Sequence, residues 1–152
     1  MTGTLSDQHL LAEALEEARK GVASGGMPFG AVLVIGDQIV SRGHNRQIQD
    51  NDFLAHAEMT CLGAFLKSHP GPLKGDVVLA ATEAPCPMCA GAAIVAGVSR
   101  IVIGETHHYS GAHDWLQTQE VELAVYQDQA CIDLVTQFRR DHADRWNRFS
   151  AG

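Results

Sequence analysis

Hydrophobic residues recur near the start of the chain with the spacing of an amphipathic helix. Between residues 6 and 24 the apolar positions lie one, three or four residues apart, and Ser6 or Asp7 is suited to cap the first turn. The glycine pair Gly25-Gly26 then interrupts the pattern. This spacing predicts a helix over residues 6–24 with one buried face.

Five short apolar runs predict strands. Residues 29–35 and 39–45 flank Gly36-Asp37, a pair suited to a tight turn, and together they predict a hairpin. Further strands are expected over 76–81, 101–103 and 120–125, and the first two of these are continuously apolar, as strands buried on both faces are. Helices are expected between and after these runs, over 56–68, 87–96, 128–140 and, more briefly, 143–149.

The order of these elements predicts the fold class. After the opening hairpin, helices and strands alternate, which favours an α/β fold: a three-layer α/β/α sandwich around a mixed five-stranded sheet. The length of 152 residues suits a single domain spanning residues 1–152. Residues 104–118, expected to be irregular, follow the end of a strand, where open α/β sheets bind ligands.

The composition narrows the class of protein. No apolar run is long enough to cross a membrane, and Met1 to Asp7 lacks the basic and apolar regions of a signal peptide, so we expect a cytoplasmic protein. The net charge of −7, from 11 basic and 18 acidic residues, argues against nucleic-acid binding. Residues 132–152 hold four arginines and three aspartates, which fits a solvated helix face better than a phosphate-binding surface.

The cysteines point to a metal site. Cys86 and Cys89 lie three apart, while Cys61 and Cys131 are isolated and fit buried apolar positions. Pro87 suits the first position of a helix, so both sulfurs of the close pair would lie on one side of its first turn. The helix N-terminus favours thiolates, the form that binds zinc.

His56 and Glu58 complete a candidate catalytic centre. Two thiolates and the His56 imidazole supply three zinc ligands and leave the fourth position for water, as in a catalytic site. Glu58, two residues after His56, can reach the same surroundings and move protons if His56 lies in the first turn of its helix.

These residues carry a resemblance to a known family. His56-Ala57-Glu58 followed by Pro85-Cys86-Pro87-Met88-Cys89 is the zinc-deaminase signature. The sequence resembles the cytidine deaminase superfamily, in the branch of cytosine, guanine and tRNA adenosine deaminases, and is most similar to fungal-type cytosine deaminases over nearly the whole chain. Further matching stretches are Gly25-Gly26-Met27-Pro28-Phe29-Gly30, Arg42-Gly43-His44-Asn45, Leu116-Gln117-Thr118, Gln137-Phe138 and Trp146.

The resemblance implies a mechanism and a set of partners. One zinc ion per chain, held by His56, Cys86 and Cys89, would activate a water molecule, and Glu58 would carry the water's proton to the ring and to the departing amine. Ammonia would be the product that leaves. The resemblance also implies a small-molecule substrate and a homodimer.

Pocket residues can be carried over by position. Asn45 would hydrogen-bond the substrate, the backbone carbonyl of Ala84 would accept from the amine or the water, and three aromatic residues would line the ring pocket: Phe29, Tyr109 and Trp146. Each of these side chains also has an ordinary structural interpretation, as a turn residue for Asn45 and as core residues for the aromatics.

Two positions depart from the pattern. Fungal-type cytosine deaminases have an acidic residue, three after the C-terminal Trp, that contacts the substrate's amino group; here Phe149 stands there and presents an apolar edge. Without that acceptor we expect cytosine to be a poor substrate, unless a shift of the last helix brings another acceptor, such as Asp144 or Glu83, to the amine. Glu83 also replaces a residue that is usually apolar. Four histidines have no assigned role: His44, His107, His108 and His113.

Three functions fit the sequence. The first is a hydrolytic deaminase of a small free cyclic amidine, with a cytosine-like nucleobase favoured and creatinine, guanine or a pterin-like ring as alternatives. The second is a tRNA adenosine deaminase, against which the acidic charge argues. The third is a zinc module without catalysis, which would not need Glu58 and would close the fourth zinc position with another ligand.

Overall fold

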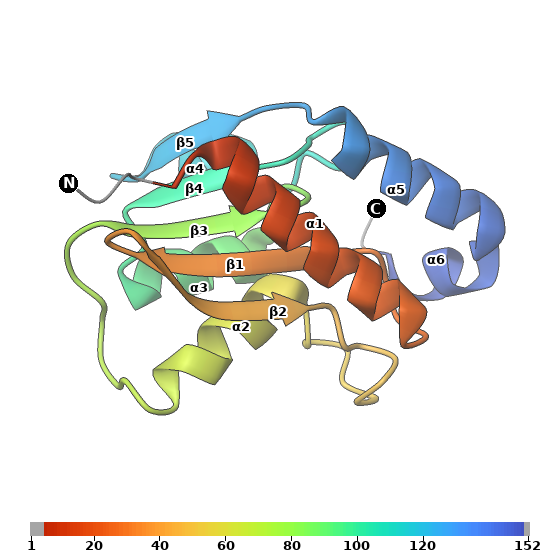
Figure 1. Ribbon diagram of the computed structural model, residues 1–152, viewed down its shortest axis with the longest axis horizontal. Coiled ribbons are helices and arrows are strands. Elements are labelled where there is room, and N and C mark those ends of the chain that lie inside the picture. Colours follow the sequence, from red (N-terminus) through yellow and green to blue (C-terminus); the bar gives the residue numbers. More distant parts are fainter. Residues whose placement is uncertain (1–4, 151–152) are drawn as a thin grey trace.

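A five-stranded mixed sheet lies at the centre of the molecule in the computed structural model, which describes residues 5–150 (Figure 1). The strands are β1 (Gly30–Ile35), β2 (Gln38–His44), β3 (Val77–Ala81), β4 (Arg100–Ile103) and β5 (Glu122–Val125). Their order across the sheet is β2-β1-β3-β4-β5; β1 pairs antiparallel with β2 and β3, whereas β3, β4 and β5 are parallel. The mixed five-stranded sheet and the α/β class that the sequence predicts are therefore confirmed.

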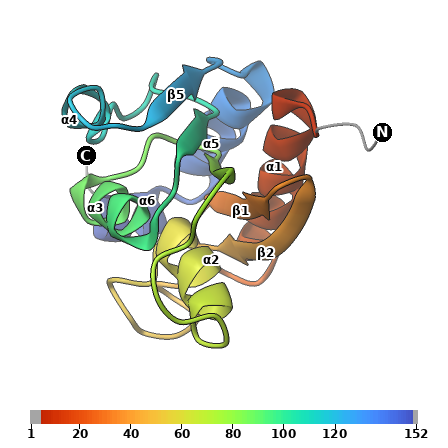
Figure 2. The same cartoon turned by 90° about the vertical axis from the view of Figure 1, so that its left-hand side faces the viewer.

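Helices cover both faces of the sheet (Figure 2). They are α1 (Asp7–Ala23), α2 (Ala57–Leu66), α3 (Pro87–Ala96), α4 (His113–Leu116), α5 (Gln129–Asp141) and α6 (Ala143–Phe149). Alternate residues of β1 point to opposite faces: Val32 and Val34 pack with Leu10 and Leu11 of α1, while Leu33 belongs to the larger core that includes α2 and α3. Both faces of the central strands are thus buried, as their continuous apolar sequences predict.

The packing of α2 on β2 is especially close. At Gly43, in β2, an added Cβ would lie 2.7 Å from the backbone nitrogen of Cys61 in α2, so only glycine fits without a shift of the helix. Because α2 begins immediately after His56, this contact fixes the position of a candidate metal ligand relative to the sheet.

The segment expected to be irregular, residues 104–118, contains a short helix. α4 spans only His113–Leu116, and Leu116 is fully buried in the larger core while Trp115 remains exposed. A single helical turn gives no periodic pattern in the sequence, so the sequence alone does not reveal this helix.

The loops at the carboxyl ends of β3 and β4 meet the last two helices. In Figure 1, β3 and β4 run toward the side of the molecule on which α5 and α6 lie. Asp128 caps α5 by accepting a hydrogen bond from the backbone nitrogen of Cys131, and α6 follows α5 after the single residue His142. None of the helices within residues 5–150 is long and apolar enough to cross a membrane. Residues 1–4, part of the stretch without signal-peptide features, lie outside the described residues.

Candidate active site

Three potential metal ligands meet at the N-termini of α2 and α3. His56 is the N-cap of α2 and Cys86 the N-cap of α3, with Pro87 at the first helical position and Cys89 in the first turn. The Nδ1 atom of His56 lies 3.5 Å from the sulfur of each cysteine, and the three ligand atoms lie within 4.8 Å of one another. The close approach that the sequence predicts for these residues is therefore present.

These distances fit one tetrahedral zinc ion. With Zn–S bonds of about 2.3 Å and Zn–N bonds of about 2.0–2.1 Å, an ideal tetrahedron separates nitrogen from sulfur by about 3.6 Å. The two observed separations of 3.5 Å match that edge. Within residues 5–150 no other group of three potential ligands lies as close together, and a zinc ion held by these three residues would leave room for water as a fourth ligand.

The surroundings of Cys86 favour its thiolate. A hydrogen bond from Cys89, followed by the interaction with His56, lowers the pKa of the Cys86 thiol to about 4 against the opposing effect of burial. Cys86 also caps α3, whose N-terminal dipole stabilises negative charge. The donor set is therefore chemically prepared for a zinc ion.

Glu58 lies beside the three ligands in a protected position. It is in the first turn of α2 and its residue is only 7% exposed. Burial raises the pKa of its carboxyl to about 7, and the charge of His56 opposes that rise. A carboxyl whose pKa lies near neutrality can both take up and release a proton, which is the property that a general acid–base requires.

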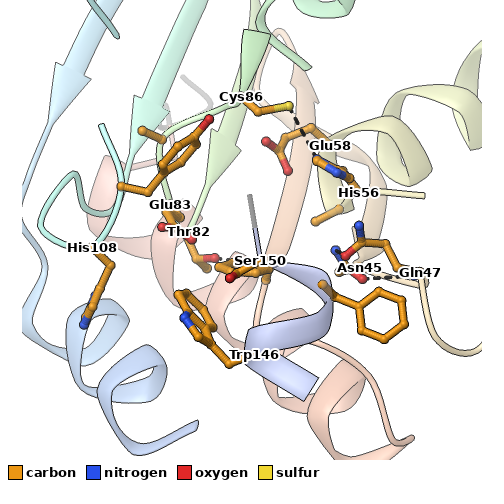
Figure 3. Close-up of a pocket in the computed structure, with 16 residues that line it drawn as sticks. Asn45, Gln47, His56, Glu58, Thr82, Glu83, Cys86, His108, Trp146 and Ser150 are labelled. Carbon is orange, nitrogen blue, oxygen red and sulfur yellow. Dashed lines mark hydrogen bonds between the residues drawn. The ribbon is translucent and has the colours of Figure 1, made fainter. Parts of the chain in front are cut away.

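A pocket of about 610 Å³, including the space at its open mouth, lies directly over this cluster. In Figure 3 the side chains of Cys86, Glu58 and His56 lie together, and Trp146 lies on the opposite side of the pocket. All the residues proposed from the sequence line this pocket except Cys89, which is fully buried beneath it. The lining set shared with the sequence prediction is Phe29, Asn45, His56, Glu58, Ala84, Cys86, Tyr109, Trp146 and Phe149.

Asn45 is held in place by two hydrogen bonds with Gln47. Its amide nitrogen donates to the side-chain oxygen of Gln47 at 2.9 Å, and its oxygen accepts from the backbone nitrogen of Gln47 at 3.0 Å. Gln47 is in turn fixed by donating to the carbonyl of Phe53. Because one amide hydrogen and one lone pair of Asn45 remain free, it can still bind a ligand in the pocket.

Aromatic side chains from distant parts of the chain cover the pocket. The ring of Phe29, just before β1, lies 6.2 Å from that of Trp146 in α6. The guanidinium of Arg139, in α5, lies 5.0 Å from the centre of the Trp146 ring. The cation and the aromatic ring attract one another, which fixes α6 against α5 over the pocket.

Sequence reasoning missed several lining residues and left others undecided. Gln47, Thr82, His108 and Ser150 line the pocket, and so does Glu83, whereas Asp144 is exposed and is not part of the lining. The only sequence signal was the charge of Glu83 in an otherwise apolar stretch. His108 was unassigned because nothing in the sequence links it to its partner, the fully buried Glu105, which accepts from its Nδ1 at 3.0 Å.

The other three unassigned histidines do not line the pocket. The Nδ1 atom of His44 lies 3.3 Å from the carboxylate of Glu17, and His113 lies 3.5 Å from Asp114. His107 packs edge-on against His108. None of the three belongs to the group of potential metal ligands.

Known proteins share both the sequence and the fold of this chain. The chain is 34% identical to cytosine deaminase of Candida albicans over 95% of its own length and 96% of the relative. It is 38% identical to the tRNA-specific adenosine deaminase of Bacillus subtilis over 64% of this chain and 61% of that one. The crystal structure of guanine deaminase from Bacillus subtilis superposes with a TM-score of 0.62 at 28% identity, covering 92% of this chain and 78% of that one.

The match to a protein family covers the metal cluster. Residues 5–105 correspond to the family described as the cytidine and deoxycytidylate deaminase zinc-binding region, and this range contains His56, Glu58, Cys86 and Cys89. The family is a zinc-binding one, in agreement with the donor set found here. The chain therefore belongs to the zinc-dependent cytidine and deoxycytidylate deaminase family.

Proposed function

We propose that this protein hydrolytically deaminates a small free cyclic amidine, with a cytosine-like nucleobase as the favoured ring. The observation that carries the proposal is the buried Glu58 beside a three-ligand zinc site, under a pocket lined with aromatic rings. The similarity to cytosine deaminase of Candida albicans supports the choice of ring, because it extends over nearly the full length of both proteins.

Glu58 carries the protons of the proposed reaction. When bound at His56, Cys86 and Cys89, zinc supplies Lewis acidity that makes water nucleophilic at neutral pH. Glu58 takes a proton from the attacking water and passes it to the ring nitrogen of the amidine. As the carbon–oxygen bond forms and the carbon–nitrogen bond breaks, Glu58 delivers the second proton of the water to the amine, which leaves as ammonia.

The remaining pocket residues hold the ring. Asn45, fixed by Gln47, offers one free donor and one free acceptor to the ring edge. Phe29, Tyr109 and Trp146 exclude water from its faces and provide apolar contact. Ala84, in the loop between β3 and α3, lines the pocket two residues before the metal ligand Cys86, and its carbonyl is proposed to accept from the amine or the water.

A screen for ammonia release tests the proposal. Purified zinc-loaded protein is incubated with cytosine, isocytosine, creatinine, guanine and a pterin, and ammonia is measured with a coupled enzyme. We expect release from at least one ring, with cytosine favoured. The guanine deaminase of Bacillus subtilis makes guanine the principal alternative ring. Release from none of the rings would refute the proposed function.

A tRNA adenosine deaminase is the second candidate, because the similarity to the enzyme of that name from Bacillus subtilis is 38% over 98 residues. The net charge of −7 argues against it, since binding to a phosphate backbone depends on basic residues. We expect no submicromolar binding of a tRNA anticodon arm at physiological salt in a filter-binding assay. Tight binding that survives added salt would favour this candidate instead.

A homodimer and a single domain spanning residues 1–152 remain predictions. Size-exclusion chromatography with light scattering measures the mass in solution, and we expect twice the chain mass of 16.3 kDa. A monomeric mass would show that the resemblance does not extend to assembly.

A further inference from the structure

Glu83 differs from the other buried glutamates of residues 5–150. Four glutamates there are buried, and Glu83 itself is 8% exposed. Glu17 is hydrogen-bonded to Lys20 and Glu105 to His108, while Glu58 lies beside the potential metal ligands and has the assigned role of moving protons. The Glu83 carboxyl has no hydrogen-bonded partner among the described residues, and only longer-range charges act on it.

The carboxyl of Glu83 faces the pocket. Glu83 lines it, and Figure 3 draws its side chain among those around the cavity. The Glu83 oxygens are not among the side-chain polar atoms of residues 5–150 that are fully buried and have no hydrogen-bond partner. We infer that these oxygens border the open space of the pocket rather than packed protein. A carboxyl that is largely buried and has no hydrogen-bond partner in the protein destabilises the fold. Such a cost is typical of residues that an active site requires.

The chain places Glu83 in the loop that leads from β3 to the metal ligands of α3. Glu83 follows β3 and precedes the metal ligand Cys86 by three residues. Burial and then the charges of Glu105 and Glu58 raise its pKa well above the usual range, while Arg139 opposes them. Glu83 is thus within electrostatic reach of Glu58. In the proposed reaction the carbon that bears the amine must lie beside Glu58, and Glu83 lines the pocket that would hold this ring.

We propose that Glu83 is a specificity-determining residue whose carboxyl accepts a hydrogen bond from the exocyclic amine of the substrate ring. This inference rests on the proposed deaminase function and names the group that selects the substrate. Phe149, which also lines the pocket, has no acceptor to offer. A hydrogen bond from the amine gives the Glu83 carboxyl the partner that the protein does not provide.

The test compares two leaving groups on one ring. Cytosine presents an amine at C4, while 4-methoxypyrimidin-2-one presents a methoxy group that cannot donate a hydrogen bond. Hydrolysis adds water to C4 of either compound and releases ammonia or methanol. For Glu83→Leu we expect kcat/KM to fall about tenfold to a hundredfold on cytosine and by less than about threefold on the methoxy compound. Glu83→Gln, which keeps one acceptor oxygen, should lose less on cytosine than Glu83→Leu.

Stability and metal content separate this role from a structural one. Glu83→Leu should keep its zinc and have an equal or higher Tm, because it removes an unpartnered buried carboxyl. Glu120→Gln, at an exposed acidic residue, is the matched control and should leave all rates unchanged. Equal losses on both compounds, or a lower Tm with lost zinc, would overturn the inference.

A binding measurement distinguishes failure of the proposed contact of Glu83 from failure of the proposed deaminase function. If the wild type turns over neither compound, calorimetry measures cytosine binding to wild type and Glu83→Leu. Binding that weakens about tenfold or more in Glu83→Leu supports the contact even though deamination of cytosine is refuted. Unchanged binding, or no binding to the wild type, overturns the inference.

Discussion

The ring of Trp146 lies 6.2 Å from the ring of Phe29, with an angle of 46° between their planes. The two residues are separated by most of the chain, one just before β1 and the other in the last helix. Their contact brings α6 over the metal cluster, and Arg139 packs on Trp146 from α5. One side of the pocket is thus formed by an aromatic contact, opposite the helices that carry the metal ligands.

Removal of the Trp146 ring should therefore affect substrate binding more than folding. For Trp146→Ala we expect KM for the accepted ring to rise about tenfold or more, since a large apolar and cation-stacked surface is lost. The zinc content should be unchanged. Trp115→Ala in α4, whose ring is exposed and does not line the pocket, is the control. Similar KM values for the two variants would contradict the role of Trp146 in covering the substrate pocket.

The metal ligands should couple zinc binding to stability. Cys86→Ser and Cys89→Ser are each expected to lose the zinc ion and to lower Tm, because metal binding contributes to folding free energy. Cys131→Ser, at a buried cysteine outside the cluster, should keep the metal. Metal content is measured by inductively coupled plasma mass spectrometry, with about one zinc per chain expected in wild type. Full zinc occupancy in both cluster variants would refute the ligand assignment.

Replacement of Glu58 should abolish turnover without removing the metal. Glu58→Gln keeps the size of the side chain but cannot accept the water's proton, so kcat should fall by at least about 100-fold. Zinc content and Tm are expected to stay near wild-type values, since Glu58 is not a ligand. Turnover within a few-fold of wild type on the accepted ring would refute the proton-transfer role.

Much of the fold follows from local patterns. The hairpin of β1 and β2 and the buried strands β3 and β4 were all predicted within about two residues, because apolar runs bounded by turn residues are unambiguous there. The metal cluster was predicted as well, since Pro87 marks the start of α3 and fixes the spacing of its cysteines. The signature and the helix starts agree, so local and global signals reinforce one another.

The remaining parts of the site depend on contacts between distant segments. Gln47 fixes Asn45, and Glu105 fixes His108, through hydrogen bonds that the spacing of these residues in the sequence does not predict. The sequence shows Glu83 as a departure from the family pattern, but only the course of the loop after β3 reveals that Glu83 lines the pocket. Burial without a partner is a property of the three-dimensional structure, and a sequence alone does not reveal it.

An ion pair between α1 and β4 should make the free energy of unfolding depend on pH in the acidic range. The guanidinium of Arg100 donates to both carboxylate oxygens of Asp7, at 2.7 and 2.5 Å, and lowers the pKa of Asp7. A lowered pKa in the folded state stabilises the protein at pH values above the unfolded pKa of about 3.9, and this stabilisation is lost as pH falls through the folded pKa.

Asp7→Asn should remove that dependence. We expect the free energy of unfolding to fall by about 1 kcal/mol at pH 7, with a smaller difference from wild type below about pH 3. Urea denaturation at a series of pH values measures the difference in free energy of unfolding between the variant and wild type. Asp114→Asn, at an exposed residue, is the control. A difference from wild type that grows as pH falls would contradict the role of this ion pair.

Phe149→Asp tests whether the acceptor for the amine can be moved across the pocket. Phe149 and Glu83 both line it, one from α6 and the other from the loop after β3. In Glu83→Leu the amine has lost its acceptor, so adding Asp at 149 should restore part of the turnover of cytosine. We expect the double variant to exceed Glu83→Leu by about tenfold in kcat/KM, the value of one charge-assisted hydrogen bond.

The single Phe149→Asp variant should behave differently, because it places a carboxylate in a pocket that already holds Glu58 and Glu83. Like charges in one site disfavour ionisation of each other, so the gain on cytosine relative to other rings should be smaller than in the Glu83→Leu background. The cycle of four proteins, assayed on cytosine and 4-methoxypyrimidin-2-one, measures this coupling. Equal effects of Phe149→Asp in both backgrounds would mean that the two positions do not serve the same amine. A gain on the methoxy compound as large as on cytosine would mean that the new carboxylate acts on the pocket as a whole and not on the amine.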